Sequence, residues 1–172
     1  LSGADDVFRL MLLWGMFLPL GARFSVDCWL KATDDFSRNR HTSVATVAIL
    51  IQVSLLYIFT FLFKWHPIWV SEFTALYYMF NLDLFANQLA PLLLEYPTIL
   101  KGLTGFFIYS EIVLTVLVWS PFLTSPLRII FIAVLGVMHL GIAAVLGIGF
   151  FPFLCCTYLL LFLPSSVWDA LR

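Results

Sequence analysis

Long apolar runs separated by short polar segments dominate the pattern along the chain. The run Val44–Phe63 contains no charged residue, and Ile129–Val167 contains no Asp, Glu, Lys or Arg. A bilayer core about 30 Å thick needs roughly 20 apolar residues in a helix. Val44–Phe63 therefore predicts one membrane span. The longer run predicts two spans, divided where glycine and proline interrupt it at Gly147–Pro152.

Two shorter apolar runs predict two further spans, which makes five in total. The first run, Val7–Ala22, is broken late by Pro19 and Gly21. The second, Leu103–Trp119, carries a single acidic residue, Glu111.

The segment Lys64–Gly102, between the second and third spans, is rich in aromatic residues and interrupted by prolines. Its stretch Glu72–Phe85 predicts a helix that lies in the membrane interface, where aromatic rings prefer to sit. No repeat or Gly/Ser-rich linker divides the sequence. We therefore expect an all-α, polytopic membrane helix bundle that forms one transmembrane domain over residues 1–172, with five spans and one interfacial aromatic segment.

Composition narrows the class of protein. Of the 172 residues, 62% are hydrophobic and 11% are charged, whereas a soluble domain is about 45–50% apolar and about 25% charged. A soluble globular domain and a disordered chain are excluded, and the lipid bilayer is the expected surrounding. The formal net charge of -1 excludes a nucleic-acid partner, because no basic field exists to hold a polyanion. The cysteines Cys28, Cys155 and Cys156 lack metal-ligand spacing, so no metal is expected.

Basic residues predict the orientation in the membrane. With five alternating spans, one side receives six of them, Arg23, Lys31, Arg38, Arg40, Arg128 and Arg172, and the other side three, Arg9, Lys64 and Lys101. The positive-inside rule then places the Arg23–Arg40 loop in the cytoplasm and Lys64–Gly102 outside.

Three ionisable residues lie in or beside apolar runs, where they are costly. Lys64 is either an interfacial lysine that extends to lipid headgroups or a partly desolvated amine that can act as a base. Glu111 and His139 are either buried hydrogen-bonding groups between helices or members of a site. We expect both to face the bundle interior, within reach of each other or of Lys64 through water.

These residues belong to a pattern that resembles the vitamin K-dependent gamma-carboxylase family, and more closely its bacterial members with a horizontally transferred transmembrane domain. The central motif is an aromatic helix end, Lys64, four residues, Trp69 and a tyrosine-rich segment. The phrase FLPLGARFSVD at Phe17–Asp27 is typical of the bacterial branch. A third match is His139, followed ten residues later by Gly149 and Phe150.

The resemblance implies a site and a cofactor. The lysine that matches Lys64 is the base that initiates oxygenation of a reduced quinone, and the histidine that matches His139 belongs to the same pocket. Glu111 would tune or relay the proton. Four aromatic residues of the interfacial segment would wall the quinone pocket: Trp65, Trp69, Tyr77 and Tyr78.

The chain also departs from the family, and two functions stay open. Family members have further upstream spans, so we expect a fragment of a longer domain, from a bacterial inner membrane. The first hypothesis is an oxygenase or carboxylase that uses a quinol or lipid, with Lys64 as base. The alternative is a non-catalytic scaffold subunit that packs against other membrane subunits in a larger respiratory or photosynthetic complex. The missing soluble substrate domain favours the alternative, and the intact spacing around Lys64 and His139 favours the enzyme.

Overall fold

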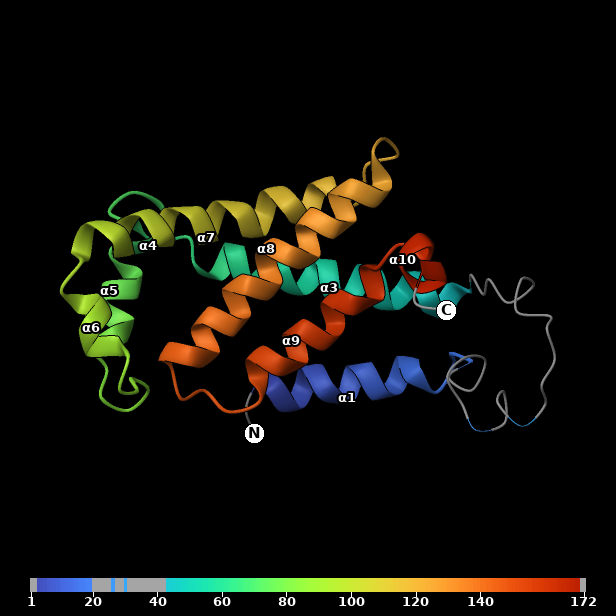
Figure 1. Ribbon diagram of the computed structural model, residues 1–172, viewed down its shortest axis with the longest axis horizontal. Helices are drawn as coiled ribbons and strands as arrows, with labels where there is room; N and C mark the ends of the chain where they lie inside the picture. Colours follow the sequence, from blue (N-terminus) through green and yellow to red (C-terminus); the bar gives the residue numbers. More distant parts are fainter. Residues whose placement is uncertain (1–2, 20–25, 27–29, 31–42, 171–172) are drawn as a thin grey trace. The chain divides into compact units, whose positions relative to one another are not determined.

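A computed structural model describes residues 3–19, 26, 30 and 43–170 (Figure 1). The regular structure in these ranges is helical throughout, apart from one isolated bridge between Ala86 and Leu146. The basic residues on which the predicted cytoplasmic loop depends, Arg23, Lys31, Arg38 and Arg40, lie outside the described residues.

The chain forms two compact units, residues 1–52 and 53–172. The first unit contains α1 (Gly3–Gly15) and the beginning of α3 (Val44–Phe63). Within it, the indole nitrogen of Trp14 donates a hydrogen bond of 2.6 Å to the side-chain oxygen of Gln52. A polar side chain inside an apolar helix is thus paired with a neighbouring helix rather than left unsatisfied.

Three helices are long and apolar enough to cross a membrane: α3, α7 (Pro97–Leu117) and α8 (Thr124–Val145). They identify the chain as a membrane protein. The predicted bounds of α3 are confirmed to the residue. Helix α7 begins six residues before the expected Leu103, because Pro97 at its first turn is preset for a helix and Gly102 does not end it.

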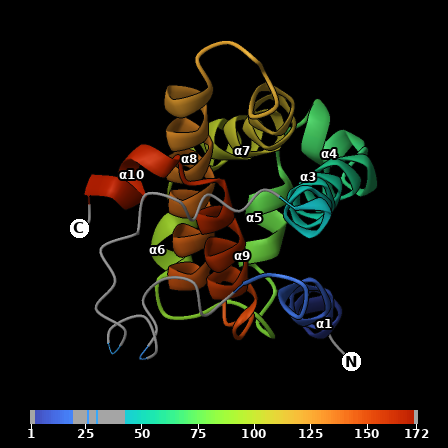
Figure 2. The same ribbon diagram turned by 90° about the vertical axis from the view of Figure 1, so that its right-hand side faces the viewer.

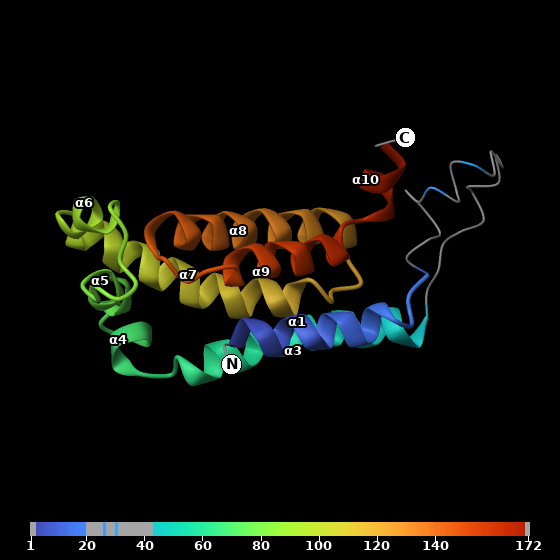
Figure 3. The same ribbon diagram turned by 90° about the horizontal axis from the view of Figure 1, so that it is seen from below.

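The last apolar run divides into separate helices where the sequence predicts, but only the first of them, α8, is long enough to count as a membrane span. Helix α8 ends at Val145, and α9 (Phe151–Leu159) continues into the 3₁₀ turn η2 (Leu160–Phe162) and α10 (Ser165–Ala170). Between them Gly149 adopts φ 67°, a conformation that a residue with a side chain rarely adopts. Because this connection is short, α8 and α9 pack side by side as antiparallel neighbours (Figure 1, Figure 2 and Figure 3).

The predicted interfacial helix over Glu72–Phe85 is wrong in length. The segment between α3 and α7 instead forms three short helices, α4 (Pro67–Val70), α5 (Ala75–Phe80) and α6 (Ala90–Leu94). The turn before α5 places Phe73 at φ 55°. The helix stops at Asn81, whose side-chain amide donates a 2.7 Å hydrogen bond to the carbonyl of Tyr77. Local hydrogen bonding of this kind competes with the helix ladder.

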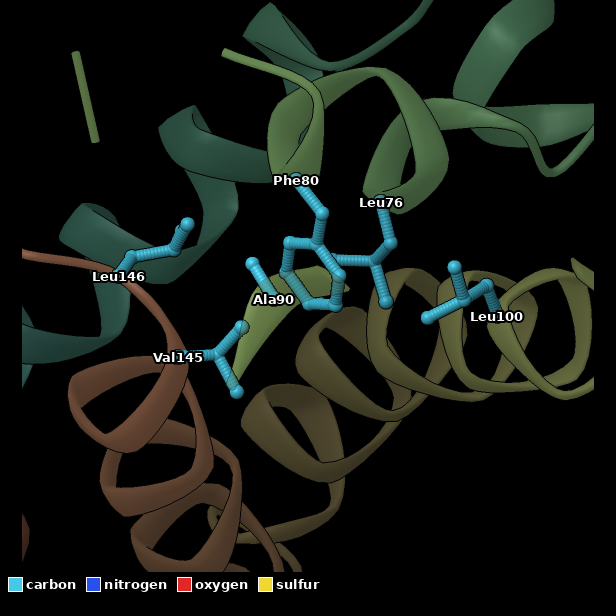
Figure 4. Close-up of a cluster of buried hydrophobic side chains, with 6 residues drawn as sticks. All are labelled: Leu76, Phe80, Ala90, Leu100, Val145 and Leu146. Carbon is cyan, nitrogen blue, oxygen red and sulfur yellow. The ribbon is translucent and has the colours of Figure 1, made fainter. Parts of the chain in front are cut away.

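A hydrophobic cluster fixes α5 and α6 to the ends of α7 and α8 (Figure 4). Its buried members are Leu76, Phe80, Ala90, Leu100, Val145 and Leu146. Two backbone hydrogen bonds reinforce the attachment, from Asn87 N–H to Val145 O at 3.0 Å and from Gly147 N–H to Phe85 O at 2.7 Å. The segment is therefore a packed cap at one end of the second unit.

Candidate functional site

Lys64 directly follows the last residue of α3 and reaches α7. Its Nζ lies 2.7 Å from Oε2 of Glu111, with which it forms both a hydrogen bond and an ion pair. The side chain of Glu111 is only 3% exposed and that of Lys64 is 26% exposed. The predicted burial of Glu111 is confirmed, and its contact with Lys64 is direct. The attraction within a pair this short is stronger than between surface charges, but desolvation of the two groups offsets most of the gain in stability.

The ring of Trp69 also contacts the lysine ammonium. The Nζ of Lys64 is 5.3 Å from the centre of a Trp69 ring, within the range of a cation–π interaction. Trp69 is carried by α4, whose first turn begins with Pro67 and is capped weakly by His66, because Nδ1 of His66 accepts a 3.5 Å hydrogen bond from the N–H of Ile68. The turn after α3 thus folds the aromatic side chain back over the lysine.

A second polar pair links α3 to α8. The hydroxyl of Tyr57 lies 3.0 Å from Nε2 of His139. Both residues are buried, at 2% and 5% exposure, so the predicted interior position of His139 is confirmed. The other ring nitrogen of His139, Nδ1, is buried and has no hydrogen-bond partner among the residues that the structure describes.

A cavity of about 220 Å³ joins the two pairs. An apolar cavity of about 150 Å³ already accommodates benzene, so this one has room for the ring system of a small aromatic molecule. Lys64, Glu111, Tyr57, His139 and Trp69 all line the cavity. Its remaining wall is made mainly of apolar side chains: Leu56, Thr60, Leu76, Met79, Phe107, Met138, Ile142, Ile148, Phe151 and Cys155.

Three aromatic residues that the sequence placed at the quinone pocket lie outside this lining. Trp65 is 66% exposed and contacts the ring of Phe61 edge-on. Tyr77 and Tyr78 are 40% and 54% exposed and contact each other. Of the four predicted pocket aromatics, only Trp69 reaches the cavity.

Sequence reasoning missed Tyr57, although a signal for it exists. Tyr57, Thr60 and Lys64 are spaced by three and four residues, the interval that places side chains on one face of a helix. A polar stripe on an otherwise apolar span indicates a face that is turned toward the interior.

The arrangement offers two separate hydrogen-bonding positions inside an apolar chamber. One position is the ion pair of Lys64 and Glu111. The other is the hydrogen-bonded pair of Tyr57 and His139. Among the described residues, no group of three or more His, Cys, Asp or Glu side chains is placed to hold a metal ion. The chamber suits an uncharged aromatic ligand that carries oxygen atoms.

Searches with models of known protein families, among curated proteins and among solved structures found no match to this chain.

Proposed function

We propose that this protein is a membrane enzyme that binds a reduced quinone in the cavity and removes a proton from it with Lys64. The contact that carries the proposal is the Lys64–Glu111 pair, because it places an amine and a carboxylate together at the wall of an apolar chamber. The apolar wall fits the ring of a quinol, and the resemblance to the gamma-carboxylase family points to the same ligand.

The pair provides a route to a neutral amine. An ammonium cannot accept a proton, so Lys64 acts as a base only after it has passed one proton to Glu111. The products, an amine and a carboxylic acid, are both uncharged and are favoured when a ligand displaces water from the chamber. The amine then takes the proton of a quinol hydroxyl and becomes ammonium, which leaves a quinolate ready for oxygenation.

We further propose that the chain crosses a bacterial inner membrane five times, with residues 23–40 in the cytoplasm and the site toward the outer face. Helix α1 and the apolar stretch Phe151–Phe162 would supply the two additional crossings. At 1.5 Å per residue each is roughly 20 Å long, so these crossings require apolar flanking residues or local thinning of the bilayer.

Oxygen-dependent oxidation of a quinol by the purified protein tests the function. Unaltered protein should produce the quinone epoxide, and Lys64→Arg should abolish turnover because guanidinium stays protonated. Lys101→Arg, which changes an exposed lysine of α7, is the matched control and should keep full activity. If the unaltered protein has no activity over background with several quinols, the enzyme function is wrong and the scaffold subunit becomes the better explanation.

A further inference from the structure

The Tyr57 side chain is held rigidly inside the second unit. Its ring packs edge-to-face on Phe131, with the ring centres 5.9 Å apart and the planes at 84°. Phe131 is itself fully buried and packs on Phe162 at 5.0 Å. Because both the ring and the hydroxyl are fixed by neighbours, the hydroxyl is preorganised at the cavity wall.

The hydroxyl of Tyr57 has hydrogen-bonding capacity beyond His139. A tyrosine hydroxyl can donate one bond and also accept, whereas the contact with Nε2 of His139 uses only one of these functions. The imidazole is expected to be neutral, because an imidazolium would bury a charged N–H at Nδ1, which has no partner within the described part of the chain. With a neutral imidazole, either partner can be the donor in the Tyr57–His139 hydrogen bond, depending on which ring nitrogen carries the proton. The hydroxyl can therefore donate to a ligand oxygen or accept from one.

The two polar positions are separated along α3. Tyr57 and Lys64 are seven residues apart, which corresponds to about 10 Å along a helix axis. The one hydroxyl between them, on Thr60, is already bonded to the carbonyl of Leu56 at 2.7 Å. The chamber wall therefore carries two polar positions that α3 sets apart, and most of the other lining side chains are apolar.

We infer that the Tyr57 hydroxyl, positioned by His139, binds the ring oxygen opposite the one that faces Lys64, so that the cavity selects aromatic rings carrying two oxygens. This inference rests on the proposed quinol function and adds a specificity-determining residue to it. Lys64 and Glu111 act on one oxygen, and Tyr57 holds the other. A ring with a single oxygen forfeits one of the two interactions.

Binding of two small ligands to the full protein tests the inference without turnover. The ligands are 1,4-dihydroxynaphthalene and 1-naphthol, measured anaerobically by equilibrium dialysis in detergent micelles. Unaltered protein should prefer the dihydroxy compound by about fivefold, the effect of one net hydrogen bond of about 1 kcal/mol. Tyr57→Phe keeps the ring on Phe131 and should reduce that preference to nearly one, with little change in the affinity for 1-naphthol.

Tyr109→Phe is the matched control. It removes a hydroxyl that donates to the carbonyl of Val70 and that lies outside the cavity lining, so the fivefold preference should stay. If Tyr57→Phe binds 1-naphthol normally and keeps the preference, the inference is wrong while the proposed function stands. If the unaltered protein binds neither compound, both are wrong.

A measurement on the unaltered protein covers the case in which Tyr57→Phe does not fold. Nitrogen-15 resonances of the His139 imidazole report its hydrogen bonding, and a His139→Asn variant assigns them. Saturation with 1,4-dihydroxynaphthalene should shift these resonances, because a ligand bond at Tyr57 redistributes the shared proton. Resonances that stay in place at saturation would overturn the inference.

Discussion

Lys64 and Glu111 are 47 residues apart in the sequence, yet their charged atoms are 2.7 Å apart at the cavity wall. Ten residues before Lys64, Ser54 accepts a 2.8 Å hydrogen bond from the indole N–H of Trp119, which follows Glu111 by eight residues. The two contacts run in opposite sequence directions, so α3 and α7 are antiparallel neighbours in the second unit. The ion pair is therefore one of several polar links that hold α3 to the bundle.

Because Glu111 is more deeply buried than Lys64, replacing either residue alone should lower the stability of the protein by a different amount. Lys64→Met leaves a carboxylate that is 3% exposed and should lower the free energy of unfolding by about 3 kcal/mol. Glu111→Met should lower the free energy of unfolding by less, because the ammonium of Lys64 is 26% exposed and can reach water. The double variant should be close to the unaltered protein. Unfolding in mixed micelles at increasing SDS fraction measures all three, with Lys101→Met as a surface control. Strictly additive single effects would contradict a coupled pair.

The positions of many helices could be predicted from the sequence, because they follow from local composition. A run without charge, glycine or proline, as in Val44–Phe63, forms a helix in a bilayer, because a helix satisfies all its backbone hydrogen bonds internally. The meeting of Lys64 and Glu111 was also within reach, since an isolated charge among apolar residues needs a partner. Only the directness of their contact was missing from the expectation.

The direction of the aromatic side chains could not be predicted. The segment after Lys64 is uniformly rich in aromatic residues, but composition does not say which rings face the cavity. That depends on turns such as the one at Phe73, whose positive φ no local pattern indicates. Trp69 lies over the Lys64 ammonium and lines the cavity, whereas Trp65, Tyr77 and Tyr78 are not among the lining residues. For Tyr57, the spacing to Thr60 and Lys64 predicts an inward-facing position, but not that its hydroxyl meets His139 on another helix.

The orientation in the membrane predicts opposite labelling at the two ends of α7. This helix has 21 residues, about 30 Å, enough to cross the bilayer once. In a variant whose cysteines are replaced by alanine, Leu84→Cys should react with an impermeant maleimide in intact cells, and Phe122→Cys only after permeabilisation. Both positions are well exposed, at 84% and 77%. Labelling of the two from the same side would contradict a single crossing by α7, and the reverse pattern would contradict the proposed orientation.

Close approach of Phe73 to α7 predicts that two glycines of that helix respond differently to alanine. Gly102 has nothing within 4 Å of an added Cβ, so Gly102→Ala should stabilise the protein by up to about 1 kcal/mol through helix propensity. At Gly105 the added atom would lie 3.3 Å from the Phe73 ring, whose turn leaves little freedom to shift. Gly105→Ala should gain less or lose stability in the same unfolding assay. Equal gains at both positions would show that Phe73 is not packed against α7.

A larger apolar side chain in the cavity should stabilise the protein and at the same time weaken ligand binding. Cys155 is buried and lines the cavity, whereas the adjacent Cys156 is half-buried, lies outside the lining and has its thiol 3.9 Å from the carbonyl of Gly136. Cys155→Leu places additional apolar atoms in the chamber, which should raise the free energy of unfolding by roughly 1 kcal/mol and weaken quinol binding at least tenfold. Cys156→Leu introduces the same side chain one residue away and should leave binding unchanged. Equilibrium dialysis with 1,4-dihydroxynaphthalene, paired with SDS unfolding, measures both effects. If the two variants bind the ligand equally well, the chamber between Lys64 and Tyr57 is not where the ligand sits.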